Sequence, residues 1–123
     1  MYNSVRHHHV ETLDYVSTIA DGIAVKQQGD LTYDLCEKYV DEIVTVTDDE
    51  ISTAILMLIE QQKLIAECAG AVAVAAALFN KVDVKGKKVA CLVSGGNIDV
   101  TILSRVISRG LLKTGRSADI TIE

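Results

Sequence analysis

The chain is short and acidic, and its composition excludes several classes of protein. It has 123 residues and a net charge of −5, from 12 lysines and arginines against 17 acidic residues. A hydrophobic content of 49%, with 24% charged and 4% aromatic residues, argues against disorder and against a stacking platform for single-stranded nucleic acid. The excess of acids works against binding a phosphate backbone. We therefore expect one globular domain without a nucleic-acid partner.

Neither membrane insertion nor metal binding is predicted. The N-terminal residues, which include His7, His8 and His9, contain no apolar signal core, and the apolar run 69–79 is too short to span a bilayer. Three adjacent histidines in a polar loop are usually solvated, and we expect the same here. We therefore predict no metal site, no membrane contact and a cytoplasmic location.

The cysteines indicate a reducing compartment. Their count of three is odd, and Cys36, Cys68 and Cys91 show no CxxC spacing. Because cysteine is among the residues most often buried, we expect all three to be reduced packing residues rather than reactive thiols.

The first half of the chain predicts a helix, a strand and a second helix. Asp30 is a plausible N-cap for a helix over 31–40, and the β-branched run 43–46 predicts a short buried strand. Thr47 and Glu50 then fit a capping box, so a helix starts there. Acidic residues crowd this helix start, and we attribute them to the helix dipole rather than to a metal site. They are Asp41, Glu42, Asp48, Asp49 and Glu50.

The second half predicts a return to the same sheet. The alanine-rich run 64–79 is apolar apart from Glu67 and predicts a buried helix, and 89–93 predicts a second buried strand. A strand, two helices and a strand form a right-handed crossover between parallel strands in nearly all cases. The predicted fold class is therefore α/β, with a three-layer αβα architecture in which helices cover both faces of a parallel sheet. Glu67 is either a carboxylate at the positive end of its helix or a site residue.

The turn Ser94–Asn97 stands where α/β proteins bind ligands. It follows the predicted strand 89–93 directly, and the crevice beyond the carboxyl ends of parallel strands is the usual binding site of such sheets. Gly95 and Gly96 allow backbone to come close to a ligand, and the Ser94 hydroxyl would point at it. The turn is therefore the first candidate for a functional site.

The end of the chain predicts a helix and a strand. The helix is capped by Asn97 or Asp99, and Gly110 fits its C′ position. The last residues, 118–123, alternate polar and apolar side chains, which indicates a strand with one buried face. Such a strand needs a neighbour, supplied either by another subunit or by a second domain.

Four segments of the chain carry a common pattern: 17–26 (Ser-Thr-Ile-Ala-Asp-Gly-Ile-Ala-Val-Lys), 39–46 (Tyr-Val-Asp-Glu-Ile-Val-Thr-Val), 66–71 (Ala-Glu-Cys-Ala-Gly-Ala) and 94–99 (Ser-Gly-Gly-Asn-Ile-Asp). In these segments the chain resembles the pyridoxal-phosphate-dependent threonine/serine dehydratases, or threonine ammonia-lyases, which are fold-type II enzymes like tryptophan synthase β. The resemblance implies that residues 1–115 are the C-terminal part of a catalytic domain. It also implies that residues 116–123 are a linker and the first strand of an ACT-like regulatory domain.

The resemblance implies roles for individual residues around the cofactor, pyridoxal 5'-phosphate. Ser94 matches the serine whose hydroxyl hydrogen-bonds the pyridine nitrogen, Gly22 a glycine whose backbone lies against the ring, and Glu67 a carboxylate near the ring. Gly95 and Gly96 would allow the close approach. A neutral hydroxyl, unlike an aspartate, does not hold the pyridine nitrogen protonated, which favours β-elimination over transamination.

Other parts of the family pattern are ambiguous or missing. Asn97 matches a position that contacts a nucleotide effector in AMP-activated members, but it is equally well explained as a helix cap. None of the eight lysines stands in the family's Schiff-base context, and the chain has no glycine-rich phosphate loop. We therefore expect the chain alone to be inactive.

The function implied by the resemblance is that of part of an L-threonine or L-serine ammonia-lyase, which converts a β-hydroxy amino acid into a 2-oxo acid and ammonia. A serine-racemase-like enzyme, which shares the Ser-Gly-Gly-Asn turn, is one alternative. A non-catalytic binding module on the same scaffold is another. The expected partners are a small amino-acid substrate and further copies of the chain, as a homo-oligomer or by self-association.

Overall fold

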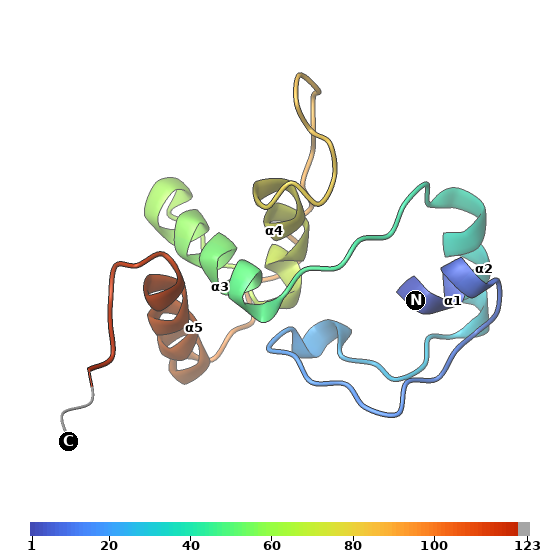
Figure 1. Cartoon of the computed structure of the whole chain (residues 1–123), viewed down its shortest axis with the longest axis horizontal. Coiled ribbons are helices and arrows are strands. Elements are labelled where there is room, and N and C mark those ends of the chain that lie inside the picture. Colours follow the sequence, from blue (N-terminus) through green and yellow to red (C-terminus); the bar gives the residue numbers. More distant parts are fainter. Residues whose placement is uncertain (121–123) are drawn as a thin grey trace.

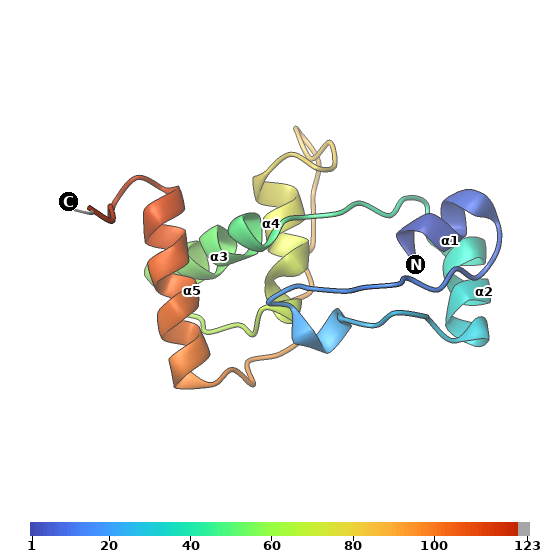
Figure 2. The same cartoon turned by 60° about the horizontal axis from the view of Figure 1, so that its bottom comes forward.

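The structure is a computed structural model that describes residues 1–120, and its helices lie in two groups (Figure 1). Helices α3, α4 and α5 pack together, while α1 and α2 lie at the other end, joined to them by extended segments (Figure 2). The α-helices are α1 (Tyr2–His7), α2 (Asp30–Tyr39), α3 (Asp48–Met57), α4 (Val72–Leu78) and α5 (Val100–Lys113). Short 3-10 turns form η1 (Asp21–Ile23) and η3 (Ala69–Ala71), and η2 (Leu58–Gln62) is π-helical.

The start of α3 confirms the predicted capping box. The Glu50 amide donates to Thr47 Oγ1 at 3.3 Å, and the Thr47 amide donates to Glu50 Oε2 at 2.7 Å. Two amides that the helix leaves without partners are thereby satisfied. Lys81 lies 2.8 Å from Glu50 Oε1, and the pKa of Glu50 is lowered chiefly by this contact. α3 continues through η2 and stops at Lys63, whose φ of 57° is left-handed.

The N-cap of α5 is confirmed as Asp99, but its predicted end is wrong. Asp99 Oδ1 accepts from the Thr101 amide at 2.7 Å. α5 does not stop at Gly110 but runs on to Lys113, so Gly110 is a buried residue inside the helix. A Cβ on Gly110 would lie 2.9 Å from the Ser52 carbonyl oxygen of α3. Gly110 therefore serves the close packing of two helices rather than a helix end.

The predicted helix over 64–79 forms only in its second half. α4 covers Val72–Leu78, preceded by η3, and residues 63–67 are not helical. The reason is a competing contact, because the Glu67 amide donates to the Gly95 carbonyl at 3.0 Å. Glu67 consequently stands before the helical turns and not inside a continuous helix. In α2, likewise, the N-cap is Gly29 rather than Asp30.

The core lies among α3, α4 and α5 and is built mostly of small side chains. Ile55 is its largest fully buried residue. Its members are Ala20, Ile51, Ala54, Ile55, Leu58, Ala66, Cys68, Ala71, Ala75 and Val106. Burial raises the pKa of the Cys68 thiol, as expected of a packing cysteine. The prediction that the other two cysteines are buried is wrong, because Cys36 is half-buried and Cys91 is exposed.

The predicted buried strands are absent from the part of the chain that the structure describes. Segments 43–46 and 89–93 are extended, but within residues 1–120 no backbone hydrogen bond joins them to another segment. Val89 is 52% exposed and Leu92 is 78% exposed, so the expected burial of 89–93 is wrong here. A strand is stable only beside a hydrogen-bonded neighbour. The layered parallel sheet therefore stays a prediction.

The chain continues after α5 without a helix or strand up to residue 120. Residues 118–120 form no strand, and 121–123 of the predicted terminal strand lie outside the described residues. Over the described length of the chain, no helix is long and apolar enough to cross a membrane.

The N-terminal group is held together by polar contacts. The buried Ser4 hydroxyl accepts from the Glu11 amide at 2.9 Å, and His8 of the α1 C-cap lies 3.0 Å from Glu37 of α2. Glu37 also accepts from Tyr33 at 2.7 Å, which raises the pKa of Tyr33 to about 12. The side chains of His7, His8 and His9 are exposed, as predicted.

Candidate functional site

The glycine turn and Glu67, thirty positions apart in sequence, meet in the structure. The Glu67 amide donates to the Gly95 carbonyl at 3.0 Å, and the Asn97 amide donates to Glu67 Oε2 at 3.2 Å. Backbone and side chain of Glu67 are thus both bound to the turn. Glu67 lies before the helical turns and not inside a helix, and its role as a site residue stays a prediction.

Gly95 and Gly96 both lie close to other atoms of the protein. A Cβ on Gly95 would lie 2.7 Å from the Glu67 carboxylate, and one on Gly96 would lie 3.0 Å from the Ile65 carbonyl oxygen. Gly70, which was not among the predicted site residues, faces the same turn, with its Cβ position 3.0 Å from the Gly95 carbonyl oxygen. Its place within the Ala-Glu-Cys-Ala-Gly-Ala segment was the available signal.

Gly22 is brought to the same place from the N-terminal half of the chain. A Cβ on Gly22 would lie 3.1 Å from Ala69 Cβ and 3.9 Å from Glu67 Oε1. η1, which carries Gly22, therefore packs against η3. The structure brings together Gly22, Glu67, Gly95, Gly96 and Asn97.

Ser94 stands at the edge of this group. It is exposed, and its hydroxyl makes no hydrogen bond within residues 1–120. Its neighbour Gly95 is held by Glu67, so the backbone that presents the hydroxyl is fixed. Ser94 is therefore a polar group on an ordered turn that remains available to a ligand.

A pocket of about 420 Å³ opens between this group and α5. Glu67, Asn97 and Asp21 line it together with Arg105 and Arg109 of α5. The remaining lining residues are Thr18, Ile19, Cys68, Ile98, Asp99, Ile102 and Val106. Acidic, basic and aliphatic side chains thus share one surface.

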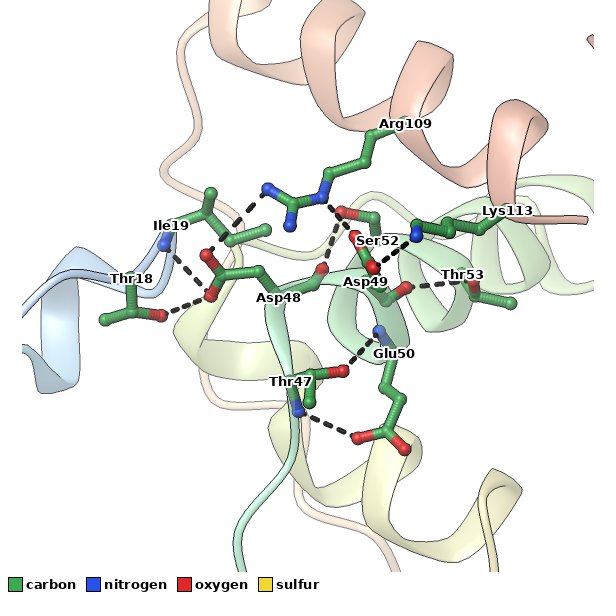
Figure 3. A network of polar contacts seen from close by, with 10 residues as sticks. All are labelled: Thr18, Ile19, Thr47, Asp48, Asp49, Glu50, Ser52, Thr53, Arg109 and Lys113. Atoms are coloured by element: carbon green, nitrogen blue, oxygen red, sulfur yellow. Dashed lines mark hydrogen bonds and ion pairs between the residues drawn. The ribbon is translucent and has the colours of Figure 1, made fainter. Parts of the chain in front are cut away.

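A polar network links the pocket wall to α3 (Figure 3). Arg109 Nε lies 2.5 Å from Asp49 Oδ1, and Lys113 Nζ lies 2.8 Å from Asp49 Oδ2. Lys113 and Arg109 together hold the pKa of Asp49 below its ordinary value. Arg109 also approaches Asp48, whose Oδ1 accepts from the Thr18 hydroxyl at 2.6 Å. The acids at the start of α3 are therefore engaged by cations and hydroxyls.

Neither metal ligands nor a lysine is found at this site in the described residues. Residues 1–120 contain no group of three or more His, Cys, Asp or Glu placed to hold a metal ion. None of the side chains that line the pocket is a lysine. Lys26, Lys63, Lys81, Lys87 and Lys113 instead contact Asp14, Glu60, Glu50, Asp83 and Asp49 respectively.

Gly95→Ala should displace Glu67 without unfolding the chain. The new methyl would collide with the far end of a flexible side chain, so the carboxylate should rotate away and release the Asn97 amide. We expect a large change in the Asn97 amide chemical shift and in its hydrogen exchange, with little change in melting temperature. Gly29→Ala is the control, since its Cβ would lie 3.5 Å from Thr32 Oγ1, an ordinary contact. An unchanged Asn97 amide in Gly95→Ala would contradict the contact.

Comparison with known proteins identifies the family to which this chain belongs. The model of the pyridoxal-phosphate dependent enzyme family (PALP) matches residues 1–95. The chain therefore belongs to this family, and the recognition made from its four segments is confirmed.

Two similar relatives within the family are L-threonine ammonia-lyases. The L-threonine ammonia-lyase of Thermotoga maritima is 57% identical over 120 residues, which cover 98% of this chain and 30% of that protein. The L-threonine ammonia-lyase of Geobacter sulfurreducens is 49% identical over 107 residues, covering 86% of this chain and 26% of that protein. The chain spans less than a third of the length of these relatives.

Solved structures show the same fold. The processed form of threonine deaminase isoform 2 from Solanum lycopersicum matches 88% of this chain and 32% of its own, with a TM-score of 0.79 and 34% identity. Serine racemase from Dictyostelium discoideum matches 80% of this chain and 32% of its own, with a TM-score of 0.71 and 34% identity. These neighbours support the predicted α/β class of fold-type II enzymes.

Proposed function

We propose that this chain forms the part of an L-threonine or L-serine ammonia-lyase active site that faces the pyridine ring of pyridoxal phosphate. The enzyme would convert a β-hydroxy amino acid into a 2-oxo acid and ammonia. The observation that supports this most is the convergence of Gly22, Glu67 and the Ser94–Asn97 turn. It occurs in a chain that is 57% identical over 120 residues to a threonine ammonia-lyase.

The donor set fits one end of the cofactor. Ser94 offers a neutral hydroxyl without a partner among residues 1–120, on a turn fixed by Glu67. When bound, pyridoxal phosphate supplies an electron sink for the α-carbon of an amino acid. Ser94 would hold the pyridine nitrogen through a hydrogen bond whose proton stays on the hydroxyl, which moderates that sink and favours elimination.

The glycines and Glu67 would shape the surface beside the ring. Gly22 and Gly95 leave no room for side chains of their own, and Glu67 lies between them with its carboxylate held by the Asn97 amide. A flat backbone surface next to a fixed carboxylate would orient a planar ring and exclude water from one side. Asn97 keeps its side chain at the pocket, where it could meet an effector.

The groups that hold the aldehyde and phosphate ends of the cofactor would come from elsewhere in the enzyme, and the isolated chain would be inactive. Residues 1–115 would belong to the catalytic domain and 116–123 to the start of an ACT-like domain. Exposed apolar residues such as Val89 and Leu92 would make the isolated chain self-associate.

A serine-racemase-like reaction is the second candidate, because the chain matches the Dictyostelium discoideum serine racemase at 34% identity and a TM-score of 0.71. The two reactions differ in product. An ammonia-lyase releases a 2-oxo acid, whereas a racemase releases the D-amino acid.

Ser94 provides the test, in a chimera in which this chain replaces the matching part of the Thermotoga maritima relative. Ser94→Ala should weaken cofactor binding about fivefold, because one hydrogen bond of about 1 kcal/mol is lost. Ser94→Asp should reduce 2-oxobutyrate formation further or change the product, because a carboxylate holds the pyridine nitrogen protonated. Cofactor affinity, 2-oxobutyrate and D-amino acid are measured in each variant.

Ser117→Ala is the matched control, because Ser117 is exposed and lies far along the chain from the turn. It should leave affinity and product unchanged. Unaltered affinity and turnover in both Ser94 variants would overturn the assignment of Ser94, and D-amino acid as the main product would favour the racemase.

A further inference from the structure

Asp48 joins three separate parts of the chain. It is the first residue of α3, and its Oδ1 accepts from the Thr18 hydroxyl at 2.6 Å and from the Ile19 amide at 3.3 Å (Figure 3). Its other oxygen, Oδ2, lies 3.9 Å from Arg109 Nη1 of α5. One carboxylate therefore fastens the segment that precedes η1 to the start of α3.

The contact extends from Thr18 through Ala20 to the backbone around Gly22. The Thr18 hydroxyl that donates to Asp48 also accepts from the Ala20 amide at 3.1 Å. Ala20 is 1% exposed and belongs to the core, and its carbonyl accepts from the Ile23 amide at 3.0 Å. The backbone on both sides of Gly22 is thereby fixed.

Gly22 has little freedom to move without affecting the site. Its Cβ position lies 3.1 Å from Ala69 Cβ and 3.9 Å from Glu67 Oε1. A shift of the residues before η1 by even a few tenths of an ångström would change the distance between Gly22 and Glu67. The position of residues 18–20 therefore determines how these two site residues face each other.

A role as helix-dipole partner does not distinguish Asp48 from its neighbour Asp49. Asp49 stands in the same first turn and would complement the dipole equally well. Within the described residues, the Asp49 carboxylate bonds Arg109 and Lys113 of α5 and not the segment 17–22. Asp48 is thus the acid that reaches the segment carrying Gly22.

We propose that Asp48 is a positioning residue that holds Thr18 and Ile19 so that Gly22 lies correctly against Glu67. It acts as a hydrogen-bond acceptor, and the ion pair with Arg109 is secondary. The consequence for catalysis rests on the proposed function, but the positioning itself does not.

The test compares Asp48→Ala, Asp48→Asn and Asp49→Ala in the 123-residue chain by amide hydrogen exchange. Asp48→Ala should raise exchange of the Ile19 amide at least about tenfold and shift the Gly22 amide resonance, because the acceptor is lost. Asp48→Asn should restore the wild-type values, because its amide oxygen can accept the same two hydrogen bonds. Asp49→Ala should leave both unchanged.

Two results would overturn the proposal: wild-type protection of Ile19 in Asp48→Ala, or an effect of Asp48→Asn as large as that of Asp48→Ala. If Asp48→Ala does not fold, Thr18→Val replaces it, since it removes the hydroxyl that bridges Asp48 and Ala20. Thr18→Val should then raise exchange at Ala20 and Thr18→Ser should restore it. Wild-type exchange at Ala20 in Thr18→Val would overturn the proposal equally.

The chimera separates this inference from the proposed function. Asp48→Ala should lower kcat/KM and weaken cofactor binding, and Asp48→Asn should rescue both. An active chimera that Asp48→Ala leaves unimpaired would overturn the role of Asp48. A wild-type chimera that binds cofactor but forms no 2-oxo acid would contradict the proposed function, while the exchange result would still decide the positioning.

Discussion

The 123-residue chain, mixed with pyridoxal phosphate and L-threonine, should form 2-oxobutyrate no faster than the cofactor alone. Elimination requires an amine that first holds the cofactor and then removes the α-proton, and a phosphate site that fixes the ring. No lysine lines the pocket beside Glu67 and Asn97 in the described residues. The measurement is 2-oxobutyrate release over time, with free cofactor as the blank.

The chimera with the Thermotoga maritima relative is the positive control and should form 2-oxobutyrate under the same conditions. Turnover by the isolated chain clearly above the blank would mean that one of its eight lysines holds the cofactor. The family correspondence of the Ser94–Asn97 turn would then have to be revised.

Ile55→Ala should remove a large part of the chain's stability. Ile55 is fully buried in the core among α3, α4 and α5. Truncating such a side chain typically costs about 2–5 kcal/mol, from lost burial and the cavity left behind. The folded-to-unfolded ratio should therefore fall by more than about tenfold, measured by guanidinium unfolding of the helical circular-dichroism signal.

Ile120→Ala is the matched control for this core substitution, because Ile120 is 83% exposed. Its unfolding free energy should stay within about 0.5 kcal/mol of the wild type. Equal midpoints for the two variants would show that Ile55 does not belong to a cooperative core.

Local signals in the sequence predicted the starts of α3 and α5 but not those of α2 and α4. The Thr47–Glu50 box and the Asp99 cap each depend on residues two or three positions apart, so nothing distant can alter them. The predicted end of α5 at Gly110 was wrong because Gly110 packs closely against Ser52, which is far away in sequence. The strands at 43–46 and 89–93 do not form within residues 1–120, because a strand depends on its neighbours and not only on its own composition.

The sequence named residues for the candidate site, but it did not predict their arrangement. The four segments identified the family. The structure places Gly22, Glu67 and the glycine turn together. The sequence left Glu67 between two roles, since a helix over 64–79 would have hidden its contact with Gly95. Gly70 was missed although it stands in the 66–71 segment, and Asp48 was attributed only to the helix dipole, because folding brings to them the groups that they contact.

Gly110 also affects the width of the pocket, although it is not one of the lining residues. Its packing against Ser52 sets the spacing of α3 and α5, and α5 forms one wall of the pocket through residues such as Arg105 and Arg109. A side chain at position 110 would push α5 outward, widening the pocket and carrying Arg109 away from Asp48. The absence of a side chain at Gly110, on the buried side of α5, thus sets the width of the pocket.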